Sequence, residues 1–198
     1  MPTSVDYYFS PSSPWTYLGH ARFHALAKQA GAAVHMRPVD YGKVFPVSGG
    51  LPVKARPLQR QAYRMLELKR WSTHLGMPLT LEPTFFPVAS NDACKMIIAA
   101  QAHGTEAAMQ CAGAVMRACW ADQQNIADRA VLAACADGAG LPGAALVAGL
   151  DDPALNTQFE AFTAEAIARQ VFGAPTYVVN DELFWGQDRL DFLARALA

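Results

Sequence analysis

Two short apolar segments separated by one amphipathic helix constrain the fold more than any other feature of this chain. Val5–Phe9 is rich in β-branched and aromatic residues, as expected of a buried strand. A helix should begin directly afterwards, because Ser13 suits an N-cap and Pro14 suits the first helical position. It should end near Gly31, and a second strand is expected over 33–39. Strand, helix and strand at this spacing predict a βαβ unit with a right-handed crossover.

The C-terminal part of the chain predicts a hairpin followed by a helix. The preceding helical periodicity breaks at 173–175, where Gly and Pro occur together. Two apolar segments, 176–179 and 182–185, then flank the polar pair Asn180-Asp181, which is a turn signal. A final amphipathic helix follows. The order of elements at the two ends of the chain is therefore β-α-β and then β-β-α.

The middle of the chain has helical periodicity almost throughout. We expect helices over 58–75, 91–103, 105–121, 127–138, 141–149 and 153–170. Before them, the Gly- and Pro-rich segment 41–57 is expected to be an irregular loop, and within them 79–87 is expected to be extended. The fold class is therefore α/β, with a thioredoxin-like domain formed by 1–57 and 170–198 and a large all-helical insertion at 58–169.

Composition excludes several functional classes. The chain has 198 residues, 16 of them basic and 17 acidic, for a formal net charge of −1, so a nucleic-acid partner is not expected. No apolar run is long enough to span a membrane and no secretory signal is visible, which predicts a cytoplasmic protein. The four cysteines form no Cys-x-x-Cys pair and are expected to be buried thiols. The histidines have no metal-ligand spacing, so no metal is expected.

The junction between the first strand and the first helix is the candidate reactive site. Thioredoxin-like proteins carry a Cys-x-x-Cys motif at this junction, but here the four positions from Ser13 to Thr16 read Ser-Pro-Trp-Thr. A serine cannot form a disulfide, so dithiol exchange is excluded. A hydroxyl and the first N–H groups of a helix still favour a thiolate placed beside them. The sequence therefore predicts a site that uses the thiol of another molecule, and glutathione is the expected donor.

Several motifs along the whole chain resemble those of one family. They are Tyr8-Phe9, Ser13–Leu18, Lys69–Trp71, Phe86–Val88, Val171–Thr176 and Phe184–Leu190. In these motifs the chain resembles 2-hydroxychromene-2-carboxylate isomerases, which are relatives of kappa-class glutathione transferases and of Dsb-type disulfide oxidoreductases. The resemblance implies bound glutathione, a homodimer and a small aromatic carboxylate as substrate. The implied reaction converts 2-hydroxychromene-2-carboxylate to trans-o-hydroxybenzylidenepyruvate in aromatic hydrocarbon catabolism.

The resemblance also implies roles for individual residues. Ser13 matches the catalytic serine, whose hydroxyl would hold the glutathione thiolate; Ser12 is the competing hydroxyl, and Ser13 could also be only an N-cap. Ala174 and Pro175 match a cis-proline step, at which the backbone would pair with the cysteinyl part of glutathione. Lys54 lies near a position where relatives contact glutathione, so it is a candidate partner for the glycyl carboxylate or the substrate carboxylate.

The remaining candidate positions lie at the start of the last helix and in the loops. Backbone N–H groups at Gln187 and Asp188 would suit the γ-glutamyl carboxylate, and the Asp188 carboxylate its ammonium; Trp185 and Gly186 would shape the approach. Candidate substrate contacts are the cations Lys43 and Arg56 and the aromatic ring of Phe86.

The expected mechanism is reversible addition of the thiolate, which turns a cis double bond into a single bond about which the chain rotates. Two alternatives share the same fold. A kappa-class-like glutathione transferase would retain the glutathione conjugate, and a non-catalytic thioredoxin-fold protein would only bind ligands. The absence of cysteine at 13 and 16 argues against a disulfide oxidoreductase.

Overall fold

A computed structural model describes residues 3–198 of the chain and contains one mixed four-stranded sheet. Its strands are β1 (Ser4–Phe9), β2 (Ala33–Pro38), β3 (Thr176–Val179) and β4 (Glu182–Trp185), in the order β2-β1-β3-β4. β1 pairs in parallel with β2, and the other two pairings are antiparallel. The βαβ unit and the C-terminal hairpin predicted from sequence are confirmed.

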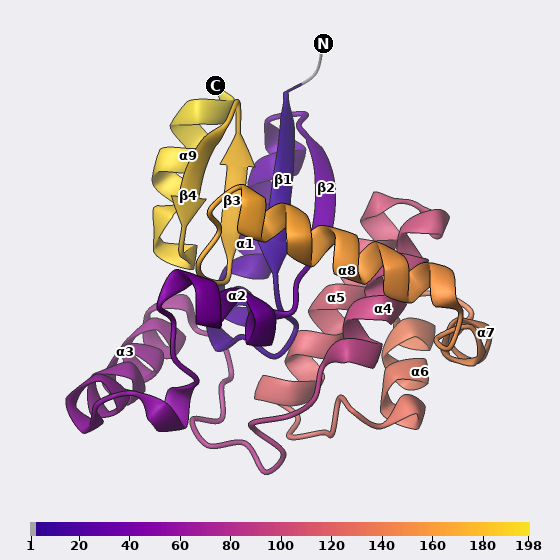
Figure 1. Ribbon diagram of the computed structural model, residues 1–198, viewed down its shortest axis with the longest axis horizontal. Helices are drawn as coiled ribbons and strands as arrows, with labels where there is room; N and C mark the ends of the chain where they lie inside the picture. Colours follow the sequence, from indigo (N-terminus) through magenta and orange to yellow (C-terminus); the bar gives the residue numbers. More distant parts are fainter. Residues whose placement is uncertain (1–2) are drawn as a thin grey trace.

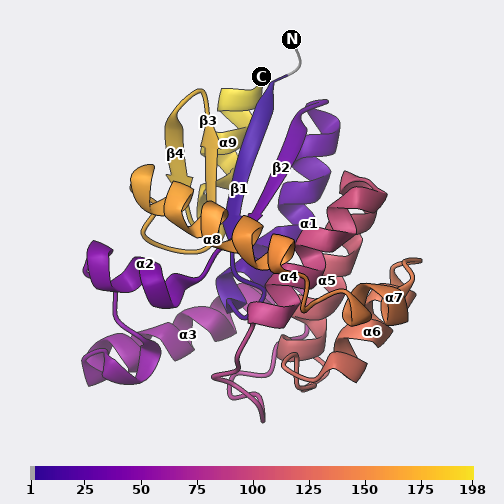
Figure 2. The same ribbon diagram turned by 45° about the vertical axis from the view of Figure 1, so that its right-hand side comes forward.

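Helices cover both faces of this sheet. α1 (Pro14–Gln29) and α9 (Leu190–Leu197) lie on one face, and α8 (Pro153–Ala168) crosses the other (Figures 1 and 2). The predicted fold class, α/β with a thioredoxin-like plan and an all-helical insertion, is confirmed.

The residues between β2 and β3 form helices and contain no strand in the part of the chain that the structure describes. Besides α8, these helices are α2 (Tyr41–Ser48), α3 (Leu58–Leu75), α4 (Asn91–Ala100), α5 (Thr105–Trp120), α6 (Arg129–Gly138) and α7 (Gly143–Ala148). Apart from α2, which was not predicted, their ends agree with the predicted helices to within about two residues, except that a short 3-10 turn at Gln101–His103 follows α4.

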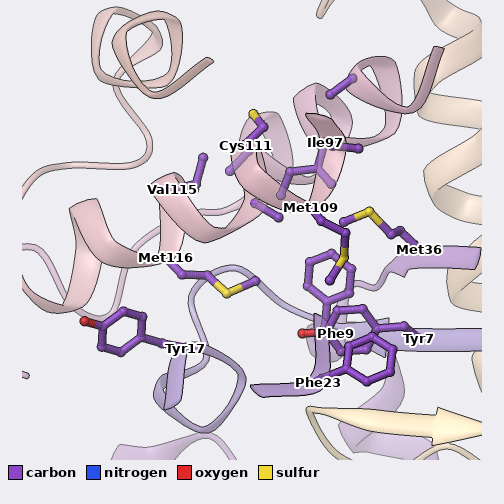
Figure 3. Close-up of a cluster of buried hydrophobic side chains, with 14 of the residues drawn as sticks. Tyr7, Phe9, Tyr17, Phe23, Met36, Ile97, Met109, Cys111, Val115 and Met116 are labelled. Atoms are coloured by element: carbon purple, nitrogen blue, oxygen red, sulfur yellow. The ribbon is translucent and has the colours of Figure 1, made fainter. Parts of the chain in front are cut away.

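One hydrophobic core joins the sheet and the helical insertion. Tyr7 and Phe9 of β1 and Phe23 of α1 belong to the same buried cluster as Met109 and Met116 of α5 (Figure 3). The rings of Tyr7 and Phe9 stack with their centroids 4.4 Å apart. The two parts therefore bury their apolar surface against each other, and their division into separate domains remains a prediction.

The prediction of an irregular loop over 41–57 is wrong, because the segment contains α2 and a 3-10 turn at Val53–Ala55. The Asp40 carboxylate accepts a hydrogen bond from the backbone N–H of Gly42 at 2.8 Å and caps α2. Gly49 ends the helix in the left-handed region, with φ at 75°, a conformation that favours glycine. The Gly and Pro residues that predict a loop therefore include the residue that terminates a short helix.

A histidine is buried in the core between α1 and α5. His20 is 5% exposed, and its ring nitrogens lie 3.1 Å from the Tyr7 hydroxyl and 2.8 Å from the Met109 carbonyl oxygen. The carbonyl only accepts, so Nε2 carries the proton and Nδ1 accepts from Tyr7. Burial lowers the pKa of His20 to about 4, although the hydrogen bond to Met109 opposes this shift. The side chain is therefore neutral near pH 7.

All four cysteines are free and buried. Burial raises the pKa of each thiol, to about 12 for Cys111 and Cys119. Within residues 3–198, no three potential metal-ligating side chains come together. In the same part of the chain, no helix combines the length and the apolar character that crossing a bilayer requires.

Candidate functional site

Three segments that are distant in sequence lie close together at one end of the sheet. β1 and β2 end there, and the antiparallel strand β3 begins there. The segment Ser10–Ser13, the start of α2 and the segment Phe172–Pro175 therefore lie near one another, and α3 lies beyond the same end of the sheet (Figures 1 and 2). These segments line the two cavities described below.

Ser13 caps α1 and also lines a cavity. Its hydroxyl oxygen accepts a hydrogen bond from the backbone N–H of Thr16 at 3.2 Å, and the side chain is partly exposed. Because a hydroxyl both accepts and donates, capping leaves its proton available to a ligand. The neighbouring Ser12 hydroxyl lies 2.9 Å from that of Ser10 and donates to Ser90 at 3.5 Å. Of the two candidate hydroxyls, that of Ser13 is the less engaged.

The loop before β3 is anchored through one carbonyl group. The Gly173 carbonyl oxygen accepts from the Tyr41 hydroxyl at 2.9 Å and from the Thr176 hydroxyl at 2.6 Å. The Ala174–Pro175 peptide bond is cis, as predicted from the sequence. Ala174 lines both cavities, and Pro175 is buried.

Two adjoining cavities extend from these loops. One, of about 540 Å³, contains the Ser13 side chain, and we call it the serine cavity. The other, of about 570 Å³, extends along Trp185–Arg189, and we call it the turn cavity. The residues lining both are Trp15, Arg56, Arg60, Arg64, Ala174 and Trp185.

The shared wall carries three arginines. Arg56 precedes α3, and Arg60 and Arg64 lie four residues apart within α3, a spacing that places their side chains on one helix face. Their exposure decreases from Arg60, which is exposed, through Arg56 to Arg64, which is 8% exposed. The serine cavity is lined by these three cations and by no carboxylate. Its electrostatics favour an anionic ligand.

The turn cavity ends at a 3-10 turn, Gln187–Arg189, just before α9. Arg22 of α1 donates to the side-chain oxygen of Gln187 at 2.7 Å and to its backbone carbonyl at 3.3 Å. The Gln187 side chain is therefore engaged inside the protein. Asp188 and Gly186 line the cavity, and the Asp188 carboxylate pairs with Arg189 at 2.8 Å.

Gly19 allows α1 to approach this turn closely. A Cβ atom at Gly19 would lie 2.6 Å from Cβ and 3.3 Å from Cα of Gln187. We expect Gly19→Ala to displace the turn and to lower the free energy of unfolding by about 1–3 kcal/mol, as overpacking does. Gly138→Ala is the control, because nothing lies within 4 Å of a Cβ there. Urea unfolding of both variants measures the effect; equal stability of Gly19→Ala and the wild type would contradict it.

The other candidates differ in how they relate to the cavities. Phe86 lines the serine cavity and packs on Trp120 with ring centroids 4.8 Å apart. Arg56 lines both cavities and donates to the Leu51 carbonyl at 2.8 Å. Lys43 pairs with Glu160 at 2.6 Å and lines neither cavity.

Lys54 is exposed and also lines neither cavity. The sequence analysis did not select Arg60 and Arg64. The signal that could have indicated Arg60 and Arg64 is their four-residue spacing, which places both on the helix face that also carries Trp71.

Comparisons with known proteins identify relatives over the whole chain. The DSBA-like thioredoxin domain family matches residues 4–198. A 2-hydroxychromene-2-carboxylate isomerase of Sphingobium xenophagum is 31% identical over 194 residues, covering 98% of this chain and 97% of the relative. A solved structure of a 2-hydroxychromene-2-carboxylate isomerase superposes with a TM-score of 0.84 at 28% identity, covering 98% and 94%. A kappa glutathione S-transferase of Caenorhabditis elegans is 24% identical, covering 98% and 90%.

Proposed function

Because this chain belongs to the DSBA-like thioredoxin family, among its 2-hydroxychromene-2-carboxylate isomerases, and is therefore an isomerase, we propose that it is glutathione-dependent. In this proposal it converts 2-hydroxychromene-2-carboxylate to trans-o-hydroxybenzylidenepyruvate. The observation that carries the proposal is the position of Ser13. Its hydroxyl lies at the N-terminus of α1, and its side chain lines a cavity that is also lined by three arginines and by no carboxylate.

The cavity residues fit the chemical groups of glutathione. The tripeptide has two carboxylates, one ammonium group and a thiol, and at the site Asp188 supplies an acceptor while the arginines supply donors. Arg56 and Arg60 are better placed for the glycyl carboxylate than Lys54, which lines neither cavity. The backbone at Ala174 would meet the cysteinyl part. The backbone N–H groups of Gln187 and Asp188 would meet the γ-glutamyl carboxylate, and the Asp188 carboxylate the ammonium.

Ser13 would act on the sulfur. Bound glutathione supplies a thiolate, the reversible nucleophile that this isomerisation requires. The Ser13 hydroxyl donates a hydrogen bond to that sulfur, and the N-terminus of α1 favours its negative charge. The arginines of the serine cavity stabilise negative charge that develops on the substrate, and the rings of Phe86 and Trp15 provide flat apolar walls for it.

The decisive experiment is an assay of the purified protein with 2-hydroxychromene-2-carboxylate. We expect trans-o-hydroxybenzylidenepyruvate to form, glutathione to be regenerated, and its omission to lower the rate by about 100-fold or more, because the site then lacks its positioned nucleophile. Spectrophotometry follows the product, and mass spectrometry follows glutathione. Accumulation of a covalent glutathione conjugate would instead identify a transferase, and a rate independent of glutathione would reject the proposed role of the thiol.

Two further expectations complete this proposal. The protein would form a homodimer and would act in the cytoplasm, where glutathione is abundant and thiols stay reduced. Both stay predictions.

A further inference from the structure

Arg64 is a buried cation without an acidic partner in the part of the chain that the structure describes. It is 8% exposed, and its Nη2 atom is shielded from solvent and has no hydrogen-bond partner there. Its Nη1 atom is 3.7 Å from the Met65 sulfur, which is a weak acceptor. Buried charges in proteins are normally paired. Within the described residues, the Nη2 donor of this guanidinium is therefore not used by the protein itself.

Two aromatic rings lie close to the Arg64 guanidinium. Its central carbon lies 5.6 Å from the centroid of the Phe86 ring and 5.9 Å from that of Trp120. The indole N–H of Trp120 is also buried without a partner. Arg64 and Phe86 line the serine cavity, whereas Trp120 is fully buried and lines neither cavity. The cavity wall therefore combines one cation that has an unused donor with one flat apolar ring. This combination matches a planar, apolar ligand that carries an acceptor.

Arg64 remains cationic despite its burial. Burial and the nearby Arg56 lower its pKa to about 10, so the guanidinium is charged near pH 7. A buried charge without a partner destabilises a folded protein, and well-packed apolar residues can replace such groups with no loss of stability. The contacts with the rings of Phe86 and Trp120 stabilise the charge in part, but within the described residues no carboxylate pairs with it.

We propose that Arg64 binds the carboxylate of a planar aromatic substrate and thereby determines specificity for aromatic carboxylates over neutral analogues. The inference rests on the proposed function and adds the residue that recognises the acid group. Of the three arginines, Arg60 is exposed, so solvent weakens its attraction, and Arg56 already donates to the Leu51 carbonyl. A guanidinium forms two parallel hydrogen bonds to a carboxylate, and Arg64 is the one of these three arginines that has an unused donor atom away from solvent.

Binding of coumarin-3-carboxylate, measured by equilibrium dialysis without glutathione, tests the proposal independently of turnover. This probe is bicyclic, planar and acidic, and its ethyl ester is a neutral analogue. We expect Arg64→Met to weaken binding of the acid roughly 10- to 100-fold, as loss of a charged hydrogen bond does, and to leave binding of the ester unchanged. Arg64→Lys should retain part of the preference for the acid.

Arg70→Met is the matched control, because Arg70 lies on the same helix, is exposed and lines neither cavity. It should bind both probes as the wild type does. Unchanged binding of the acid by Arg64→Met, or an equal loss of acid and ester binding, would overturn the proposal.

The outcomes also separate this inference from the proposed function. If the wild type binds the acid through Arg64 but does not isomerise 2-hydroxychromene-2-carboxylate, the inference stands and the proposed function fails. If the wild type isomerises that substrate with glutathione and Arg64→Met has an unchanged kcat/KM, the proposed function stands and the inference fails.

Discussion

Replacing Ser13 by alanine is expected to lower the turnover of 2-hydroxychromene-2-carboxylate about 100- to 1000-fold, the range observed when one positioned donor to a reacting anion is removed. The reason is that, in the proposed site, the Ser13 hydroxyl at the N-terminus of α1 lines the serine cavity and would donate to the bound thiolate. The thiol of bound glutathione should then ionise at higher pH. Steady-state kinetics and the ultraviolet absorbance of the thiolate as a function of pH measure the two effects.

The cap must be separated from the chemistry in this experiment. Ser13→Ala also removes the acceptor for the Thr16 N–H, which costs about 1 kcal/mol of stability. Ser13→Gly has a much smaller effect on the cap but equally lacks the hydroxyl, so it should be as inactive as the alanine variant. Ser12→Ala should remain active, because Ser12 interacts with Ser10 and Ser90. Full activity of both Ser13 variants would reject the role of this residue.

Acidification from pH 6.5 to pH 4 is expected to remove about 3 kcal/mol of stability through His20 alone. The pKa of His20 is lowered by burial to about 4 in the folded protein, against 6.5 for an exposed histidine. Below pH 6.5 the unfolded chain therefore binds a proton that the folded chain excludes, so the free energy of unfolding falls as the pH falls. The loss levels off below the folded pKa, where both states are protonated.

Urea unfolding at several pH values checks this expectation. In His20→Gln the amide can still donate to the Met109 carbonyl and accept from the Tyr7 hydroxyl, but it does not titrate. Its stability should vary much less between pH 6.5 and pH 4. His103→Gln, at an exposed position, should retain the steep dependence of the wild type. A slope in His20→Gln as steep as in the wild type would show that other groups cause the acid sensitivity.

Local signals were sufficient to predict most of the fold. The hairpin is one example: Asn180 and Asp181 both have positive φ, 49° and 64°, which suits the tight turn that their sequence predicts. The segment containing α2 was not predictable in the same way. Pro46 lies inside this short helix and Gly49 ends it, so residues that normally indicate a loop occur within and beside a helix that packs against α8.

The candidate site was predictable where a local motif defines it. Ser13 follows from the strand–helix junction, and Asp188 from the motif before the last helix. The arginines of α3 were harder to select, because their importance depends on which helix face is turned toward the loops at 10–13 and 172–175. That orientation is set by tertiary packing and not by the periodicity of α3. The same packing leaves Lys43 paired with Glu160 instead of near the cavities.

The burial of every cysteine has a consequence for how long such a catalyst lasts. Exchange between thiols and disulfides requires an accessible thiolate, and here the four thiols are enclosed, with their pKa values raised. The polypeptide can therefore work in a large excess of external thiol and disulfide without being modified. In the proposed mechanism the reactive sulfur belongs to bound glutathione, so oxidation affects glutathione and not the protein. When oxidised glutathione dissociates, another glutathione molecule can bind, and the enzyme regains activity without repair of the polypeptide.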